Sequence, residues 1–162
     1  MLLQNKGIFF MTKTENFQLD PGSVMYKGVS LGASSGPITI LKKTSIYEVF
    51  CDSHAIEPIH SIITGVKMEI SMTLAEVDSG MDLFLDANGQ LDRSVIGTDL
   101  KSNAGELVIS INENGKEVSY KFPNAVLSPD YKYSADDKDK NIMDVVFSGG
   151  SNSGTYMQKI IN

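Results

Sequence analysis

The stretch VKMEISMTL at residues 66–74 decides the fold class of this 162-residue chain. Its apolar positions alternate strictly with polar ones and are Val66, Met68, Ile70, Met72 and Leu74. Side chains of a β-strand point alternately to its two faces, so a period of two places all five on one face. The segment is therefore predicted to be a half-buried strand.

A second segment, LVISINENGKEVSYKF at residues 107–122, shows this period on both sides of a turn signal. The turn residues Asn114 and Gly115 separate two alternating runs, which predicts a β-hairpin. Weaker alternation predicts further strands at Ser23–Lys27, Ile38–Leu41, Tyr47–Cys51 and Met143–Phe147.

One helix is expected, capped by Ser79 and ended by Asn88 and Gly89, because Met81, Phe84 and Leu85 fall at helical spacing. Polar composition predicts loops at Gly28–Pro37 and Ser134–Asn141 and a turn at Gly149–Gly154. The expected fold class is mainly β. It is a β-sandwich or partly closed barrel of two packed sheets with one short flanking α-helix.

The composition limits the functional classes. A formal net charge of −6, with scattered basic residues, argues against a surface that grips nucleic-acid phosphates. No apolar run reaches the roughly 20 residues of a membrane span. The single cysteine, Cys51, cannot form an internal disulfide, which favours assembly in a reducing cytoplasm. Residues 1–10 are interpreted as a leader or mis-assigned start before Met11, and residues 11–162 as a single domain with flexible terminal arms.

No sequence motif in the chain gives strong support for a metal site or a catalytic site. His54, Glu57 and His60 match no zinc spacing, and residues 82–92 lack the glycine position and closing glutamate of a calcium loop. No serine lies in a nucleophile motif, and no glycine-rich stretch carries the lysine of a phosphate loop. We therefore expect a non-enzymatic protein with no catalytic residue, cofactor or metal.

The order of segments resembles the tail tube (major tail) proteins of tailed bacteriophages. The similarity begins with FQLDPGSVMYKGVSLG at residues 17–32, GPITI at 36–40 and YEVFCD at 47–52. It continues through TLAEV at 73–77, the hairpin at 107–122 followed by PNA, and VVFSG at 145–149.

The resemblance implies two packed sheets flanked by a helix, with six copies in a ring and rings stacked into a tube. Such a tube holds the tape-measure protein, meets tail terminator and distal tail or baseplate proteins, and conducts DNA at infection without binding it specifically. It also implies location in the virion tail, after assembly in the host cytoplasm, with no membrane partner.

Two sets of residues are assigned to this assembly. A loop between rings is expected to use Gly28, Leu31, Gly32, Ser35, Gly36 and Pro37. The N-terminal arm at residues 11–17 and the segment after Gly154 are expected to join it, because polar flexible stretches often order on binding. Outward parity assigns part of the lumen either to Glu69, Ser71 and Thr73 on one strand or to the strand at residues 106–112, with Glu106 and Ser110. An acidic lining would let DNA pass without trapping it.

Three alternatives remain open on the sequence. The tube could belong to a contractile tail, a tail-like bacteriocin or a secretion system. A β-sandwich module that binds carbohydrate or acts as an adhesin is a rival of another class. An enzyme ranks third, because no constellation able to carry chemistry is visible.

Overall fold

The alternating segments form ten antiparallel strands in the computed structural model. The structure describes residues 7–50, 58, 60–75, 104–128, 132–136, 140–151 and 154–162. Every regular element within these ranges is a β-strand. The strands are β1 (Gly7–Leu19), β2 (Ser23–Tyr26), β3 (Val29–Ser34), β4 (Ile38–Phe50), β5 (His60–Ala75), β6 (Gly105–Glu113), β7 (Lys116–Leu127), β8 (Lys132–Asp136), β9 (Lys140–Gly150) and β10 (Gln158–Ile161). The expected mainly β class is confirmed. The expected helix at residues 79–89 lies outside the described residues.

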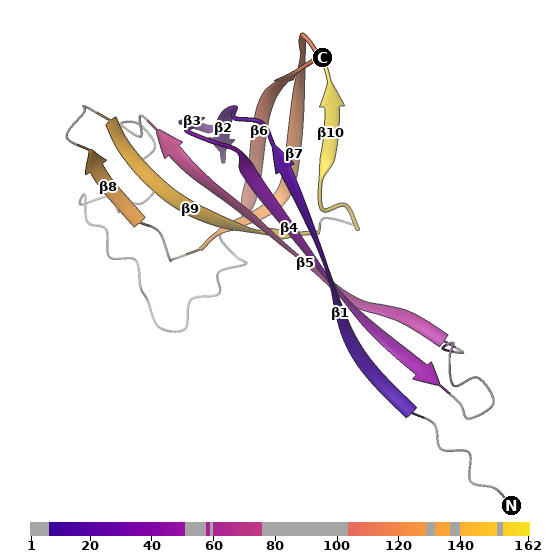
Figure 1. Cartoon of the computed structure of the whole chain (residues 1–162). Coiled ribbons are helices and arrows are strands. Elements are labelled where there is room, and N and C mark those ends of the chain that lie inside the picture. Colours follow the sequence, from indigo (N-terminus) through magenta and orange to yellow (C-terminus); the bar gives the residue numbers. More distant parts are fainter. Residues whose placement is uncertain are drawn as a thin grey trace, which may run out of the picture.

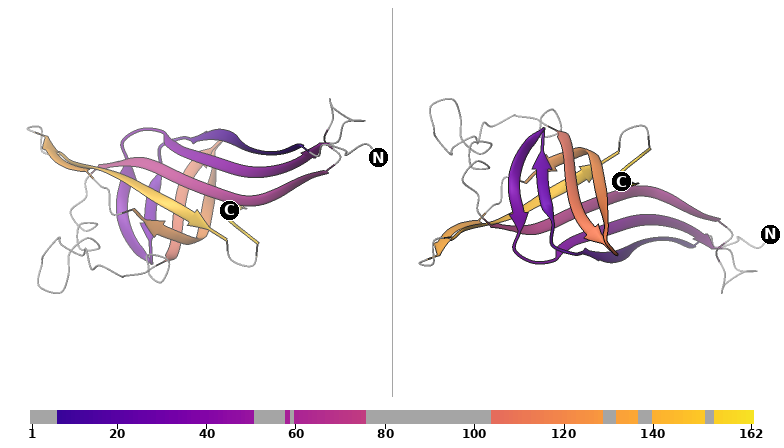
Figure 2. Two further views of the ribbon diagram at one scale, coloured as in Figure 1. Left: turned by 90° about the horizontal axis from the view of Figure 1, so that it is seen from below. Right: turned by 90° about the horizontal axis from the view of Figure 1, so that it is seen from above.

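Six of the strands close into a barrel. β5 pairs with β3, β3 with β2, β2 with β6, β6 with β7, β7 with β9, and β9 returns to β5. β2, β3, β6 and β7 run across the direction of β5 and β9 (Figure 2), so two layers face each other with the core between them. Closure by hydrogen bonding within one chain leaves these six strands with few free edges.

The core is built from the alternating residues. Met68, Ile70, Met72 and Leu74 of β5 are all buried, as the period of two predicts. Phe122 of β7 and the other large core side chains are fully enclosed, and complete burial of such a side chain contributes about 1.5–3 kcal/mol. The remaining buried apolar residues come from the other five barrel strands and from the start of β4.

Two tight turns connect neighbouring strands. Asn114 and Gly115 have φ values of 52° and 80°, and Lys27 and Gly28 have values of 51° and 77°. Positive φ at both central residues is the type I′ geometry that suits the twist of a two-residue hairpin. The expected hairpin at residues 107–122 is confirmed as β6 and β7.

Both predicted loops contain strand, and these expectations were wrong. Residues 29–34 form β3, in which Leu31 is the extra residue of a bulge and is buried in the core. Residues 134–136 belong to β8, and residues 140 and 141 to β9; residues 137–139 lie outside the described residues. Polar composition misled here because strands pair through backbone N–H and C=O groups, which polar residues carry as well as apolar ones.

Three strands continue past the barrel as an arm, which comprises residues 7–16, 41–50 and 60–67. β4 is one strand over the range in which two were expected, and it pairs with β1 on one side and β5 on the other. Figure 1 shows these three strands leaving the barrel together as a twisted ribbon. β1 begins at Gly7, so part of the segment interpreted as a leader is paired with β4.

Candidate assembly surface

The arm has two sheet edges that pair with no strand of the described residues. β1 pairs with β4 on one edge only, along all 13 of its residues. β5 pairs with β9 from Met68 onward, but its residues 60–65 pair only with β4. Unpaired strand edges expose rows of N–H and C=O groups that can accept a strand from another chain.

Apolar side chains lie on both faces of the arm at the same height. The register aligns Met11, Ile46 and Ile63 on the face continuous with the core. It aligns Phe10, Tyr47 and Ile62 on the opposite face, where the Phe10 and Tyr47 rings pack edge to face at 5.4 Å. Directly paired residues share a face of a sheet, so these two sets form transverse apolar rows.

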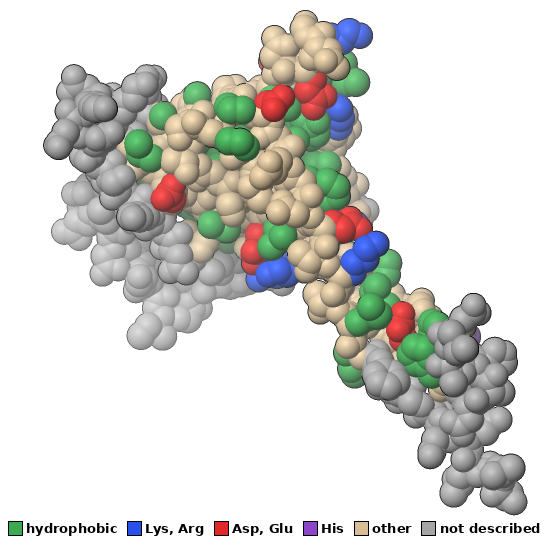
Figure 3. All heavy atoms as spheres, in the orientation of Figure 1, with side chains coloured by type: hydrophobic (Ala, Val, Ile, Leu, Met, Phe, Trp, Pro, Cys, Tyr) green, Lys and Arg blue, Asp and Glu red, His purple; other side chains and the backbone are tan. Residues whose placement is uncertain are grey.

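These two rows are open to solvent in a single chain. Phe10 is 78% exposed, Ile63 65%, Ile62 54% and Met11 47%. Hydrophobic side chains lie among charged ones on the described part of the arm (Figure 3). Clustered exposed apolar residues mark a binding surface, whereas isolated ones need no explanation. Because both faces carry a row, a partner would have to cover the arm from two sides.

Nearer the barrel the outer face of the arm is polar and its charges balance. Glu69 lies 3.8 Å from the Lys43 ammonium and 3.2 Å from that of Lys67. All three side chains are partly exposed, and such surface ion pairs contribute about 0–1 kcal/mol. Their effect is to keep this face hydrophilic.

The predicted lumen residues fall on two opposite layers. Glu69, Ser71 and Thr73 lie on the outer face of β5, as predicted from parity, and Thr73 donates a hydrogen bond of 2.6 Å to Asp144. Glu106 and Ser110 lie on the outer face of β6, and the Ser110 hydroxyl is 3.3 Å from that of Ser119. Because β5 and β6 belong to different layers, one lumen cannot be lined by both sets.

The β5 side is polar but not acidic. Its outer face continues over β1, β4 and β9, where the charged positions of the described residues are Lys43, Lys67, Glu69 and Asp144. Two ammonium groups offset two carboxylates. Between Phe10 and the end of β1, the positions on this face are Thr12, Thr14, Asn16 and Gln18. On this face the charges balance instead of being acidic in excess, and Leu41 and Val146 lie among the polar side chains.

The predicted inter-ring residues do not form one exposed loop. Leu31 is only 1% exposed, and Gly32 has a φ of 95° within the bulge of β3. Gly28 is in the turn before β3, and Ser35, Gly36 and Pro37 link β3 to β4. Of the residues predicted to contact another ring, the exposed ones thus lie at the two ends of this segment.

A polar cluster that the sequence did not indicate fixes the C-terminal strand. The Tyr120 hydroxyl and the Lys159 ammonium donate to Glu113, at 2.7 and 3.0 Å (O···O and N···O). The hydrogen bond from Tyr120, and to a lesser extent that from Lys159, holds the pKa of the Glu113 carboxyl below its usual value. Burial, and then the bond to Glu113, raises the pKa of Tyr120, while Glu113 raises that of Lys159. The cluster joins β10 to the β6–β7 hairpin of its own chain.

Neither a protein-family model nor a curated protein matches the chain. No helix in the described residues has the length and apolar character of a membrane span. Within the same residues no three of His, Cys, Asp and Glu gather as a metal site would require. His60 is exposed on β5, while His54, Glu57 and residues 82–92 lie outside the described residues.

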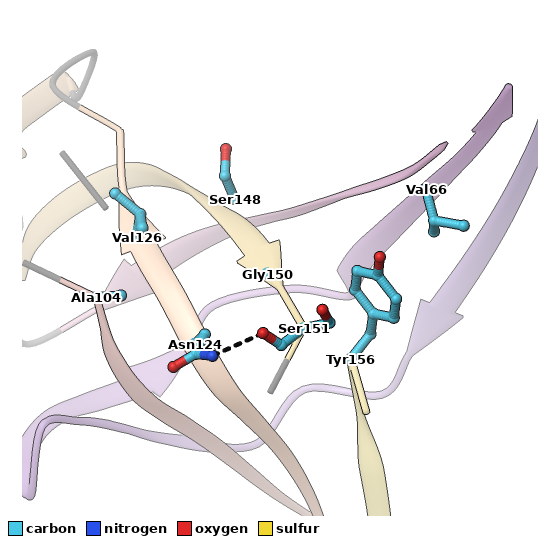
Figure 4. A pocket seen from close by; sticks show the side chains of 8 residues that line it. All are labelled: Val66, Ala104, Asn124, Val126, Ser148, Gly150, Ser151 and Tyr156. Atoms are coloured by element: carbon cyan, nitrogen blue, oxygen red, sulfur yellow. Dashed lines mark hydrogen bonds between the residues drawn. The ribbon is translucent and has the colours of Figure 1, made fainter. Parts of the chain in front are cut away.

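A cavity lies beside the barrel at the base of the arm. It has a volume of about 580 Å³, within the usual range for small-molecule sites. Val66, Val126 and Tyr156 supply apolar walls, and the Asn124 amide donates a 2.8 Å hydrogen bond to the Ser151 carbonyl (Figure 4). Sequence reasoning missed it because its walls come from segments far apart in the chain.

Proposed function

We propose that this chain is a structural, non-enzymatic virion protein that assembles into rings and, by stacking of rings, into the tail tube of a bacteriophage. The main support for the proposal is the exposed surface of the arm. It combines two sheet edges that no described strand of the same chain pairs with and apolar rows that are exposed on both faces. Such an edge is an aggregation hazard in a monomer, and it becomes an asset when identical copies cover it.

The layered β architecture and the order of the sequence segments agree with this assignment. The finer features that the resemblance implies, namely the tail tube fold, the flanking helix and six copies per ring, are part of the proposal. So are its implied partners: the tape-measure protein, the tail terminator and the distal tail or baseplate proteins. The protein would act in the virion after assembly in the host cytoplasm.

The outer face of β5, with Glu69, Ser71 and Thr73, is the better candidate for the lumen. It is continuous with the outer faces of β4 and β1, and the open edges lie on β1 and β5 at the two sides of this sheet, so neighbouring copies would extend it into a wall. A face whose positive and negative charges balance has no excess of positive charge to hold DNA phosphates. Glu106 and Ser110 would then face away from the lumen.

The test is direct visualisation of assembly. Purified protein should form rings or tubes by negative-stain electron microscopy as its concentration rises, and antibodies against it should label the tails of virions. A particle that remains monomeric up to millimolar concentration and is missing from virions would defeat the proposal. Tubes from contractile tails, bacteriocins and secretion systems share these properties, and a sheath around the labelled tube would distinguish the contractile forms.

The cavity favours a second candidate, a carbohydrate-binding or adhesin module. Tyr156 offers an aromatic face and Asn124 an amide at the cavity, and sugars are recognised by such combinations of apolar and polar groups. Titration of glycans against the monomer, followed by calorimetry, separates the two functions. Saturable binding abolished by Tyr156→Ala in a chain that forms no tubes would favour the module.

A further inference from the structure

The two open edges of the arm belong to strands that run in the same direction. β1 and β5 are both antiparallel to β4, and therefore parallel to each other. The open edge of β1 faces one side of the arm and that of β5 faces the other. Each arm thus offers one acceptor edge to each of two neighbours.

Symmetry distinguishes the ways in which copies could cover these edges. A two-fold contact between two β1 strands would leave residues 60–65 of β5 open, together with Ile62 and Ile63. A two-fold contact between two β5 strands would leave all 13 residues of β1 open. A single type of contact covers both edges of every copy only if it is head-to-tail, whereas two-fold pairing would need two different contacts. A head-to-tail contact generates a ring or an open helix.

We propose that β5 of one copy pairs as a parallel strand with β1 of the next. This inference rests on the proposed function and names the partner edges of its ring contact. When the arms of two neighbouring copies lie at the same height, Ile63 lies beside Met11 of the neighbour and Ile62 beside Phe10 of the neighbour. The apolar rows of successive copies then join into continuous bands on both faces of the shared sheet.

Disulfide trapping tests the pairing. In the single chain Thr12 and Gly65 lie at the same height on one face, separated by Ser45 of β4. Two strand spacings place them about 9–10 Å apart, too far for an internal disulfide. Between neighbouring copies they would be adjacent. Thr12 is exposed, and a Cβ on Gly65 would meet nothing within 4 Å, so both positions should accept cysteine.

The experiment uses the full chain with Cys51→Ser, which removes its own thiol. Oxidation of the assembled Thr12→Cys/Gly65→Cys variant should give a ladder of covalent multimers on a non-reducing gel, and the ladder should disappear on reduction. Each single-cysteine variant is a matched control and should give no ladder. Dimers from Thr12→Cys alone would instead show the two-fold β1 contact and overturn the inference.

A measurement on the unaltered chain guards against misfolding of the variants. Amide hydrogen exchange should slow on assembly in residues 8–12 and in residues 60–65 together. Protection of one edge without the other would refute the head-to-tail pairing. Tubes that form without a ladder defeat this inference and leave the proposed function standing, whereas a parent chain that never assembles defeats both.

Discussion

Replacing Ile63 by threonine should weaken assembly without weakening the fold. Ile63 is 65% exposed in the single chain, on the row that the proposed contact covers. Full burial of an isoleucine contributes about 1.5–3 kcal/mol, so burial of the exposed part contributes about 1–2 kcal/mol per contact. That corresponds to roughly 5–30-fold weaker association at each contact. Threonine keeps the strand propensity of a β-branched residue, so the arm itself should persist.

Ile161 provides the matched control for contacts within a ring. It is 62% exposed and lies on β10, away from the arm, in the segment expected to join contacts between rings. The same change, Ile161→Thr, removes a comparable apolar surface elsewhere. Sedimentation velocity over a dilution series measures the midpoint at which monomers form single rings, before rings stack, and thermal unfolding of the monomer measures stability. The midpoint should rise several-fold for Ile63→Thr only. An equal shift for Ile161→Thr, or none for Ile63→Thr, would refute the assignment of the assembly surface to the arm.

Three further predictions concern the fold and its C-terminal strand. Leu31→Ala should lower the free energy of unfolding by about 2–5 kcal/mol in urea titrations because Leu31 is buried, whereas Val29→Ala, at a 37% exposed site, should cost less than about 1 kcal/mol. Tyr26→Phe should cost about 1–3 kcal/mol by leaving the Ala125 carbonyl without its buried 3.0 Å bond, as thermal unfolding would measure. The folded pKa of Glu113 lies below its ordinary value of 4.5, so its contribution is present above that pH and is lost as the pH falls through the folded pKa. The protection factors of the β10 amides, which correct for the intrinsic pH dependence of exchange, should therefore fall below about pH 4.5 in the parent and should depend less on pH in Glu113→Gln.

Strand alternation carried most of the correct fold prediction. The segments at 66–74 and 107–122 have one buried face and one wet face, and this asymmetry is recorded in the sequence as a period of two. The turn at Asn114 and Gly115 was readable for the same local reason, since few residues adopt positive φ at low cost. These signals depend only on neighbours along the chain.

The errors arose where local composition and tertiary role diverge. The segment around Leu31 is rich in glycine and serine, yet it supplies the strand that closes the barrel between β2 and β5. Its hydrogen bonds come from partners far along the chain, and sequence patterning does not reveal long-range pairing. The sequence left the lumen face open between two strands for a related reason, because parity tells inside from outside but not one layer from another.

By itself, the sequence determined that this chain is mainly β, which residues face the core, and where the strongest hairpin turns. The tertiary structure alone decided that six strands close on themselves while β1, β4 and β5 run on as an arm with open edges. The physical reason is that the hydrophobicity of each side chain predicts its burial, whereas strands pair through backbone N–H and C=O groups that almost every residue carries. Which edges remain free for another copy can therefore be known only once all the strands have been placed.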